Sequence, residues 1–552
     1  MDFKPWHKNY HYSVPTHIRY PQYPVQNFLH IAASHFPDKT AVSFYGRNFS
    51  FWELRIEMLR MANAMGRLGV KKGERVGIAL PNCPQYIITY LAVLSLGAIV
   101  VNMNPQYTYD ELKFMMENTS METLITVDTA LPTFRMLVKA LGCRRLIVTK
   151  TEDYKQGYGL STAKSFDLED GWYHFSDLLD ACSDTRLPKD TFTPHDPAMI
   201  QFTGGTTGVP KGALLSHANI VASTLQCAIW LGPTVNLTPY ADRTVLGIIP
   251  YFHIYGTMIA MNYSFVTGCS QILMQRFEIG EFMDQIARLK QVTFFPAVPT
   301  MITAMVNYPD AADLNLGKRF RFVNSGGAPM PTELIGRVKD MGIFFGEGWG
   351  MSETTAMGIS NPLMGHRAGS IGVPVPDNDV RLVDTENGVE DVKPGDPGEI
   401  LIKGPTVMKS YWNDPEETKK QITDGWLHTG DIAQADEDGY LYIVDRKKDM
   451  IIAGGFNIYP REVDEVLYQH DKIAEAVTVG VPDEYRGETV KAYVVLKPGA
   501  MVTDKEIISF CKSKLAAYKI PRIVEFRTAL PKSAVGKILR KILREEEMMK
   551  RK

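Results

Sequence analysis

A run of small residues that ends in a lysine carries the strongest chemical signal in the sequence. It reads FTGGTTGVPKG over residues 202–212 and follows the apolar stretch 198–202. Glycines allow backbone N–H groups to converge on an anion, threonine hydroxyls add donors, and a lysine adds positive charge. It is not a Walker A loop, because Val209 and Pro210 precede the lysine, nor a dinucleotide-binding GxGxxG. The run therefore indicates a polyphosphate site, and the alternative is a flexible linker.

This run resembles the ATP-binding loop of the adenylate-forming enzymes, the family of acyl-CoA synthetases, luciferases and peptide-synthetase adenylation domains. In that family the loop with the pattern [YF]TSGTTGxPKG binds the β- and γ-phosphates of ATP. Gly204 stands where most members carry serine, a variation that resembles the bacterial fatty-acyl-CoA ligases. Further matches recur in order from about Phe51 to Arg540, which is nearly the whole chain. The resemblance implies that the phosphates contact Thr203, Gly204, Gly205, Thr206, Thr207, Gly208 and Lys211.

Three further motifs resemble the nucleotide and acyl pocket of these enzymes. The first, residues 250–256, reads PYFHIYG and implies a histidine beside the carboxylate of the acid. The second, residues 324–329, reads NSGGAP and implies a segment that lines adenine and the acyl chain. In GWGMSE, residues 348–353, the tryptophan offers a flat face to adenine, the serine a hydroxyl near the α-phosphate, and the glutamate a hard oxygen ligand for Mg²⁺. The residues so assigned are His253, Gly326, Gly327, Ala328, Pro329, Gly348, Trp349, Gly350, Met351, Ser352 and Glu353.

Gly350 bears on the size of the acid. In acetate-specific relatives the matching position is a tryptophan that plugs the acyl pocket. The resemblance therefore implies that a glycine leaves the pocket open to an acid longer or bulkier than acetate. By the same resemblance, His253, Gly326 and Gly350 are expected to border the acyl chain.

The ribose site is predicted farther along the chain. WLHTGD, residues 426–431, resembles the segment whose aspartate accepts hydrogen bonds from both ribose hydroxyls. An ionised carboxylate only accepts, which suits a diol, although Asp431 taken alone is also typical of a turn after a glycine. The resemblance makes Arg446 a second ribose contact and Lys448 the hinge.

Lys537 is the residue expected to serve adenylation. Its segment PKSAVGKILR, residues 531–540, indicates by itself a solvated lysine before a basic helix, but it resembles the family segment that reaches the active site. A carboxylate must attack a phosphorus surrounded by negative oxygens, so catalysis is mainly alignment and charge neutralisation. The same lysine would obstruct the thiol in the second half-reaction, and in the family a rotation brings residues 451–456 there instead. The residues expected to take part in the chemistry are Thr203, His253, Glu353 and Lys537.

The elements that must position these residues alternate between helix and strand over about the first 440 residues. Residues 51–68 show an amphipathic helical pattern, 75–80 a short strand and 86–96 a buried helix. Such alternation predicts α/β layers with largely parallel sheets. From about Pro394, frequent Gly and Asp predict short strands joined by tight turns, in a small barrel-like unit or an antiparallel sheet.

A charged run at residues 445–449 divides the chain, unless it is only a solvated turn. We expect a large N-terminal domain, residues 1–445, that binds AMP and the acyl group, and a small mobile α+β domain, residues 446–552. The elements predicted in the small domain are strands over 474–481 and 490–496 and a helix from the capping pair Thr503 and Glu506 to Ala516.

Composition excludes several classes of function. The chain has 552 residues, 45% hydrophobic and 22% charged, with a net charge of −2, so nothing electrostatic favours nucleic acid. Its six scattered cysteines form no CxxC pair and are expected to be buried free thiols. The N-terminus lacks the apolar core of a signal peptide, and the apolar stretch 86–101 is short for a membrane span. We expect a cytoplasmic protein without an integral membrane segment, and the sequence leaves peripheral membrane contact and a homodimer open.

The combined motifs predict an AMP-forming ligase that joins a medium- to long-chain fatty acid to coenzyme A, using ATP and Mg²⁺. The C-terminal third most resembles bacterial long-chain ligases in DRKKDMI (445–451), GFNIYPRE (455–462) and YRGETVK (485–491). The alternatives are an aryl or alicyclic acid–CoA ligase, a nucleotide-binding regulator without chemistry, and an adenylating domain that loads a carrier protein. Ile452, where plant aryl-acid ligases and luciferases carry lysine, weakens the first. The presence of Glu353 and Lys537 weakens the second. The short segment after Arg540 weakens the third.

Overall fold

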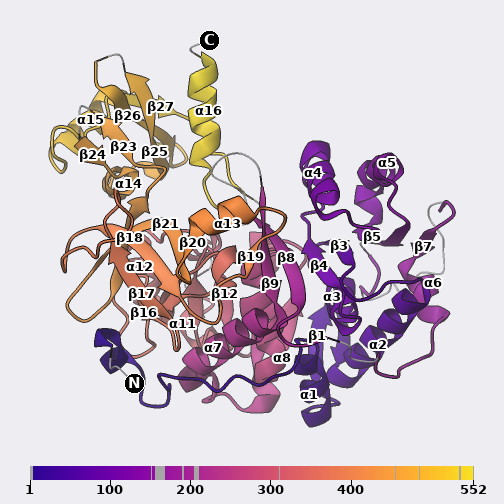
Figure 1. The fold of residues 1–552 in the computed structure, drawn as a ribbon. Helices are drawn as coiled ribbons and strands as arrows, with labels where there is room; N and C mark the ends of the chain where they lie inside the picture. Colours follow the sequence, from indigo (N-terminus) through magenta and orange to yellow (C-terminus); the bar gives the residue numbers. More distant parts are fainter. Residues whose placement is uncertain are drawn as a thin grey trace.

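The computed structural model shows a broad N-terminal part and a smaller C-terminal part that stands on one edge of it (Figure 1). Its described residues are 4–150, 152–155, 168–188, 192–203, 210–309, 311, 313–453, 456–483, 485–533 and 536–550. The mixed α/β layers agree with the predicted fold class. Over the described residues, no helix combines the length and the apolar character that crossing a membrane requires.

The largest sheet leads into the predicted phosphate loop. Its order is β19-β9-β8-β4-β3-β5-β6-β7, parallel from β8 to β7, with antiparallel pairing of β8, β9 and β19 at the other edge. Strand β3 confirms the strand predicted over 75–80. The strands are β3 Arg75–Ala79, β4 Ile99–Asn102, β5 Thr123–Val127, β6 Arg145–Thr149, β7 Trp172–His174, β8 Pro197–Thr203, β9 Lys211–Ser216 and β19 Ser410–Tyr411.

Two smaller sheets carry the other predicted motifs. In the order β12-β13-β14-β15-β16, β13 and β14 are parallel neighbours, so the segments after them leave the sheet at the same edge. The second sheet has the order β10-β11-β1-β2. Their strands are β1 Thr40–Phe44, β2 Arg47–Ser50, β10 Thr244–Gly247, β11 Ser270–Leu273, β12 Phe295–Ala297, β13 Val323–Ser325, β14 Phe345–Trp349, β15 Ile359–Ser360 and β16 Val373–Pro374.

The two helices predicted in the N-terminal part, over 51–68 and 86–96, are present as α2 and α3, with bounds that differ by one or two residues. Ser50 and Glu53 form a capping box at the start of α2, and α3 is buried on all sides, as its apolar sequence requires. All six cysteines are buried and free, as expected. The helices are α1 Asn27–His35, α2 Phe51–Arg67, α3 Pro84–Ser95, α4 Tyr109–Thr119, α5 Leu131–Leu141, α6 Phe175–Asp180, α7 His217–Val235, α8 Tyr263–Thr267, α9 Ile279–Arg288, α10 Pro299–Val306, α11 Leu316–Arg319, α12 Thr332–Asp340 and α13 Pro415–Gln421.

The glycine- and aspartate-rich segment forms an open antiparallel sheet. Its order is β17-β18-β21-β20, and β22 pairs with β21, so the antiparallel alternative describes it better than a barrel. The β21–β22 register sets Asp431 opposite Arg446, which brings the two predicted ribose contacts together. The strands are β17 Asp379–Val383, β18 Gly398–Lys403, β20 Ile422–Thr423, β21 Trp426–Ala435 and β22 Leu441–Arg446.

The C-terminal part has its own sheet and its own hydrophobic core. The sheet order is β24-β23-β26-β25 with β27 beside β26, and the core includes Val463, Leu467 and Cys511. The capping box of Thr503 and Glu506 is present, but the prediction that its helix reaches Ala516 was wrong. That helix ends at Lys512, and the chain turns so that Leu515 packs against the core. The elements are β23 Ile451–Ala453, β24 Phe456–Ile458, α14 Pro460–Tyr468, β25 Ile473–Asp483, β26 Gly487–Leu496, α15 Asp504–Lys512, β27 Ile523–Phe526 and α16 Arg540–Lys550.

Candidate active site

The hairpin of β8 and β9 presents the two ends of the predicted phosphate loop. Thr203 and Lys211 are paired across it, and the Thr203 hydroxyl lies 3.4 Å from the Lys211 carbonyl oxygen. The Lys211 ammonium is ion-paired with Glu417 of α13 and lies 5.5 Å from the centre of the Tyr411 ring. The predicted contacts outside the described residues are Gly204, Gly205, Thr206, Thr207 and Gly208.

Glu353 is a buried carboxylate beside this lysine. It lies in a helical turn, Ser352–Thr354, that follows β14, and its side chain is only 5% exposed. The Tyr411 hydroxyl donates to Glu353 Oε1 at 2.8 Å. Burial raises the pKa of Glu353, while Arg446 and Lys211 act in the opposite direction. Tyr411 was missed at the sequence level, because nothing in its spacing links it to a glutamate in another segment.

Asp431 is held by two partners on different strands. Trp349 Nε1–H at the end of β14 donates to Asp431 Oδ2 at 2.8 Å, and Arg446 Nε lies 3.0 Å from Oδ1. Each carboxylate oxygen has two lone pairs, so one acceptor position on each oxygen is left for a ribose hydroxyl. The pairing also fixes the plane of the Trp349 indole beside the aspartate. The structure thus brings together three residues that the sequence assigned to the nucleotide.

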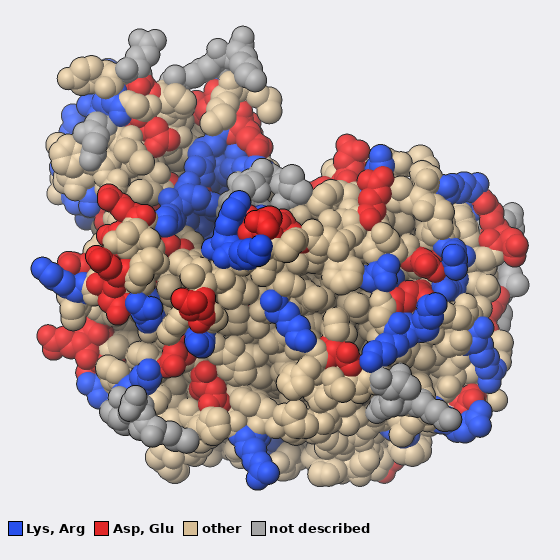
Figure 2. Space-filling view, viewed as in Figure 1, with Lys and Arg blue, Asp and Glu red and all other residues tan. Residues whose placement is uncertain are grey.

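Lys537 reaches this group from the C-terminal part. The Arg446 guanidinium is the main cause that lowers the pKa of Lys537 to about 7; burial acts in the same direction and Asp431 opposes it. The neighbouring Gly536 has φ +75°, and a Cβ there would lie 2.5 Å from Thr300 Oγ1 on α10. The turn that carries Lys537 therefore packs directly on the N-terminal part. Figure 2 shows basic side chains gathered where the two parts meet, as a site for a polyphosphate requires.

The charge of Lys537 acts on the imidazole of His253. Burial and the Lys537 ammonium lower the pKa of His253 to about 4, so the imidazole is neutral at pH 7. Its Nδ1 accepts from the Tyr255 backbone N–H at 3.2 Å, which leaves Nε2 to carry the proton. His253 is therefore equipped to donate one hydrogen bond to a carboxylate, rather than to supply a positive charge.

The segment after β13 packs against Tyr255. Asn324 Nδ2 donates to the Tyr255 hydroxyl at 3.1 Å, and a Cβ on the buried Gly326 would lie 3.2 Å from the Tyr255 ring. Gly327 has φ +77°, a conformation that favours glycine. The next two residues, Ala328 and Pro329, continue at the surface. The segment thus lies beside Tyr255, two residues from His253, and its role in lining adenine and the acyl chain stays a prediction.

The segment after β14 shows a steric reason for the glycine at position 350. A Cβ on Gly350 would lie 1.7 Å from the Ala356 carbonyl oxygen. A side chain at Gly350 therefore requires a different backbone path, and the expectation that the glycine leaves the acyl pocket open stays a prediction. Gly348, Met351 and Ser352 flank the same turn, and Ser352 is 9% exposed.

The predicted hinge is tied to both parts. The Lys447 ammonium lies 3.0 Å from Glu399 Oε2 of β18, on the N-terminal side. On the other side, Arg544 of α16 pairs with Asp449 and donates to the Lys448 carbonyl at 3.0 Å. The Lys448 side chain itself is exposed, which is compatible with a residue whose backbone turns.

Glu347 was not singled out by the sequence, yet it is a buried carboxylate next to the site. It lies on β14, is 6% exposed, and its Oε2 has no hydrogen-bond partner among the described residues. Burial raises the pKa of Glu347 to about 7, although Arg461 of α14 and the N–H groups of Gly369 and Met330 act against it.

The charge of Glu347 is expected to make stability depend on pH. Because its folded pKa exceeds the unfolded one, its contribution to stability is complete below the unfolded pKa and is lost as pH rises through 7. Glu347→Gln should therefore raise the free energy of unfolding by up to about 3 kcal/mol at pH 8.5 and change it little at pH 5. Thermal melts at both pH values test this, with the exposed Glu386→Gln as control. An equal shift at both pH values would contradict the assignment.

The comparisons with known proteins cover nearly the whole chain. A model described as AMP-binding enzyme matches residues 29–412, and one described as AMP-binding enzyme C-terminal domain matches residues 462–537. A long-chain-fatty-acid–CoA ligase of Bacillus subtilis (strain 168) is 41% identical over 556 residues, covering 99% of this chain and 98% of that protein.

Two solved structures show how closely the fold is shared. The anthranilate CoA ligase AuaEII in complex with anthranoyl-AMP superposes with a TM-score of 0.85 at 28% identity, covering 96% of this chain and 98% of that one. The ATP-bound MatB of Rhodopseudomonas palustris gives a TM-score of 0.83 at 28% identity, covering 94% of this chain and 98% of that one.

Proposed function

The chain belongs to the AMP-binding enzyme family, and on that premise we propose that it joins a medium- to long-chain fatty acid to coenzyme A at the expense of ATP. It is an AMP-forming acid–thiol ligase. The first half-reaction makes an acyl-adenylate and releases pyrophosphate, and the second transfers the acyl group to the thiol of CoA and releases AMP. The proposed place of action is the cytoplasm, and the proposed partners are the acid, ATP and CoA.

One observation carries the proposal. Lys537, from the C-terminal part, lies within electrostatic reach of His253 and of the pair Asp431 and Arg446, which face each other across β21 and β22. These are the groups that the adenylate-forming motif assigns to the ribose and the acid. Their convergence in this pose supports adenylation as the reaction for which the site is arranged.

The residues divide the work of the first half-reaction. A carboxylate oxygen of the acid attacks the α-phosphorus, and the bond from that phosphorus to the oxygen of the departing pyrophosphate breaks. Asp431 holds the ribose, and His253 Nε2–H orients the acid. The Lys537 ammonium neutralises charge at the α-phosphate: at about 3 Å and an effective dielectric near 20 the attraction is roughly 5 kcal/mol. Lys211 and Thr203 hold the pyrophosphate end, and only the part of each interaction gained in the transition state accelerates the step.

Magnesium fits the carboxylate that the site provides. No cluster of three His, Cys, Asp or Glu side chains suited to a metal occurs among the described residues. Mg²⁺, however, is commonly bound through one or two carboxylates plus substrate phosphates, and Glu353 offers such a carboxylate. When bound, the ion would neutralise phosphate charge.

The second half-reaction requires Lys537 to leave. We propose that residues 446–552 move as a domain relative to residues 1–445, with the turn at Lys448 as the hinge. The sulfur of CoA then attacks the acyl carbon, the bond to the AMP oxygen breaks, and the segment 451–456 replaces the Lys537 turn at the site. Ile452 and Phe456, both more than half exposed in the present pose, are available for that contact.

Pyrophosphate release and CoA consumption over a panel of acids test the proposal. Fatty acids of medium and long chain should drive both reactions with equal stoichiometry. Preference for aryl or alicyclic acids would favour the alternative ligase. Pyrophosphate release without CoA consumption would favour a carrier-loading enzyme. ATP binding without pyrophosphate release would favour a nucleotide-binding regulator. Either of the last two results would overturn the proposed function.

A further inference from the structure

Lys211, the lysine that follows the phosphate loop, is neutralised by a partner that no motif assigns. We propose that Glu417 of α13 is an exchange partner for Lys211. It holds the ammonium when the phosphate site is empty, releases it to the triphosphate, and takes it back as pyrophosphate leaves. Glu417 would thus weaken the binding of both ATP and pyrophosphate. This inference rests on the proposed function, because it concerns the same phosphate site.

Strand pairing places the first two members of this arrangement. Strand β9 begins at Lys211, and β19 lies antiparallel beside it with Tyr411 opposite Ala213. The Trp412 N–H donates to the Gly212 carbonyl at 2.7 Å and extends that contact. The Tyr411 ring is therefore fixed under the Lys211 ammonium, 5.5 Å from it, while its hydroxyl donates to Glu353.

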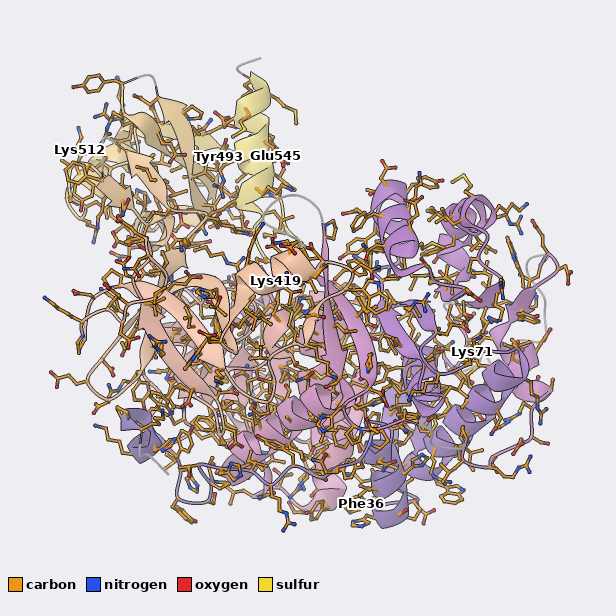
Figure 3. The ribbon with its side chains drawn as sticks, viewed as in Figure 1. Phe36, Lys71, Lys419, Tyr493, Lys512 and Glu545 are labelled. Atoms are coloured by element: carbon orange, nitrogen blue, oxygen red, sulfur yellow. The ribbon has the colours of Figure 1, made fainter. Side chains whose placement is uncertain are left out.

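The start of α13 then turns Glu417 back toward the lysine. The Asp414 side chain accepts from the Glu417 N–H at 3.0 Å and caps the helix. The Thr418 hydroxyl accepts from the Tyr411 N–H at 2.9 Å and donates to the Asp414 carbonyl at 2.7 Å. These bonds fix the first turn of α13 to β19, so Glu417 does not depend on a flexible loop for its place. In Figure 3, the label Lys419 marks α13, the helix that carries Glu417.

The pair lies in an environment where charge matters. The side chains of Lys211 and Glu417 are 16% and 24% exposed, so solvent screens them less than a surface pair. The other Glu417 oxygen lies 4.0 Å from the exposed Lys420. A triphosphate that reaches Lys211 must displace a carboxylate and then lie near it. Both effects oppose phosphate binding, and both disappear when Glu417 loses its charge.

The change Glu417→Gln keeps the shape of the side chain and removes the charge. We expect the KM for ATP to fall about fivefold to tenfold. The inhibition constant of pyrophosphate, measured through thioester formation, should fall by a similar factor. Glu416→Gln is the matched control, since Glu416 lies on the same helical turn, is 76% exposed and pairs with Lys419. In a Lys211→Met background, Glu417→Gln should lower both constants by a much smaller factor, because only the direct repulsion between Glu417 and the phosphates then remains.

An unchanged KM for ATP in the Glu417→Gln protein would overturn the exchange role. A raised KM would also overturn it, and would indicate that Glu417 positions Lys211 for phosphate binding. An equal effect of Glu417→Gln in the Lys211→Met background would also overturn it, because the effect would not pass through the lysine. Absence of pyrophosphate release by the unaltered chain over the whole acid panel would count against the proposed function itself. The two failures are thus distinguishable.

Discussion

Lys537→Ala is expected to slow acyl-adenylate formation about 10³-fold and to leave thioester formation from a supplied acyl-adenylate near the unaltered rate. The lysine is half-buried, and the charges of Arg446 and Asp431 act on it. A loss of about 4 kcal/mol of transition-state stabilisation, most of the attraction of roughly 5 kcal/mol, corresponds to that factor. The second half-reaction begins after this lysine has left, so it should not depend on it.

Single-turnover measurements of the two half-reactions separate these outcomes. Pyrophosphate release reports adenylation, and thioester yield from a purified acyl-adenylate with CoA reports the second step. The matched control is Lys541→Ala, because Lys541 is an exposed residue of α16 whose ammonium lies 3.5 Å from Glu545 Oε1. Equal loss in both half-reactions of the Lys537→Ala protein would refute the division of labour and indicate damage to the C-terminal part.

The same lysine should make the rate of adenylation fall at alkaline pH. Its pKa of about 7 in the unliganded chain means that the ammonium is present below pH 7 and is lost above it. ATP binds best to the charged form, so above pH 7 binding must be accompanied by uptake of a proton. We expect kcat/KM for ATP to fall toward tenfold per pH unit above 7, while the thioester half-reaction shows no such fall. In Lys537→Arg the fall should disappear from the accessible range, because arginine stays charged.

The parts of the site that motifs specify were predictable from the sequence. Asp431 and Arg446 lie in two strands joined by a tight turn, so the predicted hairpin already implied that they meet. Trp349 ends β14 and Glu353 follows it, while Gly326 follows the parallel neighbour β13, and parallel strands deliver the segments that follow them to one edge. In each case a local pattern determined the element, and the element determined the place of the residue.

The residues that escaped prediction make contacts between segments without a local signature. Tyr411 reaches Glu353 across 58 positions, and Glu417 reaches Lys211 across 206. Glu347 looks like any strand residue until the loops at Met330 and Gly369 and the helix α14 close over it. Such pairs depend on how layers pack, which periodicity and capping patterns do not encode.

Gly350 shows that a glycine in a family pattern can have more than one physical reason. The resemblance attributes the missing side chain to an open pocket, and the structure adds that a Cβ at this position would clash with the Ala356 carbonyl oxygen. A glycine permits two backbone segments to approach as readily as it leaves a cavity, and the sequence does not distinguish the two. The helix expected to reach Ala516 failed because the packing of Leu515 rather than helix propensity ended it.

Asp431→Ala is expected to raise the KM for ATP about 10²-fold, with a smaller effect on the turnover number. The carboxylate accepts from Trp349 and faces Arg446, and it is the proposed acceptor of the ribose diol. Its removal deletes charge-assisted hydrogen bonds worth about 1.5–3 kcal/mol each and frees both neighbours to reorient. Asp431→Asn, which keeps one acceptor oxygen, should have an intermediate effect.

A structural role alone would also weaken the protein, so the control must lose a comparable ion pair elsewhere in the same sheet. Asp436, the residue directly after β21, pairs with Arg367 at 2.5 Å and lies outside the proposed site. Asp436→Ala should lower the melting temperature about as much as Asp431→Ala, because each change leaves a partly buried arginine with fewer partners. Only Asp431→Ala should raise the KM for ATP. If both variants raise it equally, the aspartate serves the fold and not the ribose, and the proposed nucleotide site loses its central residue.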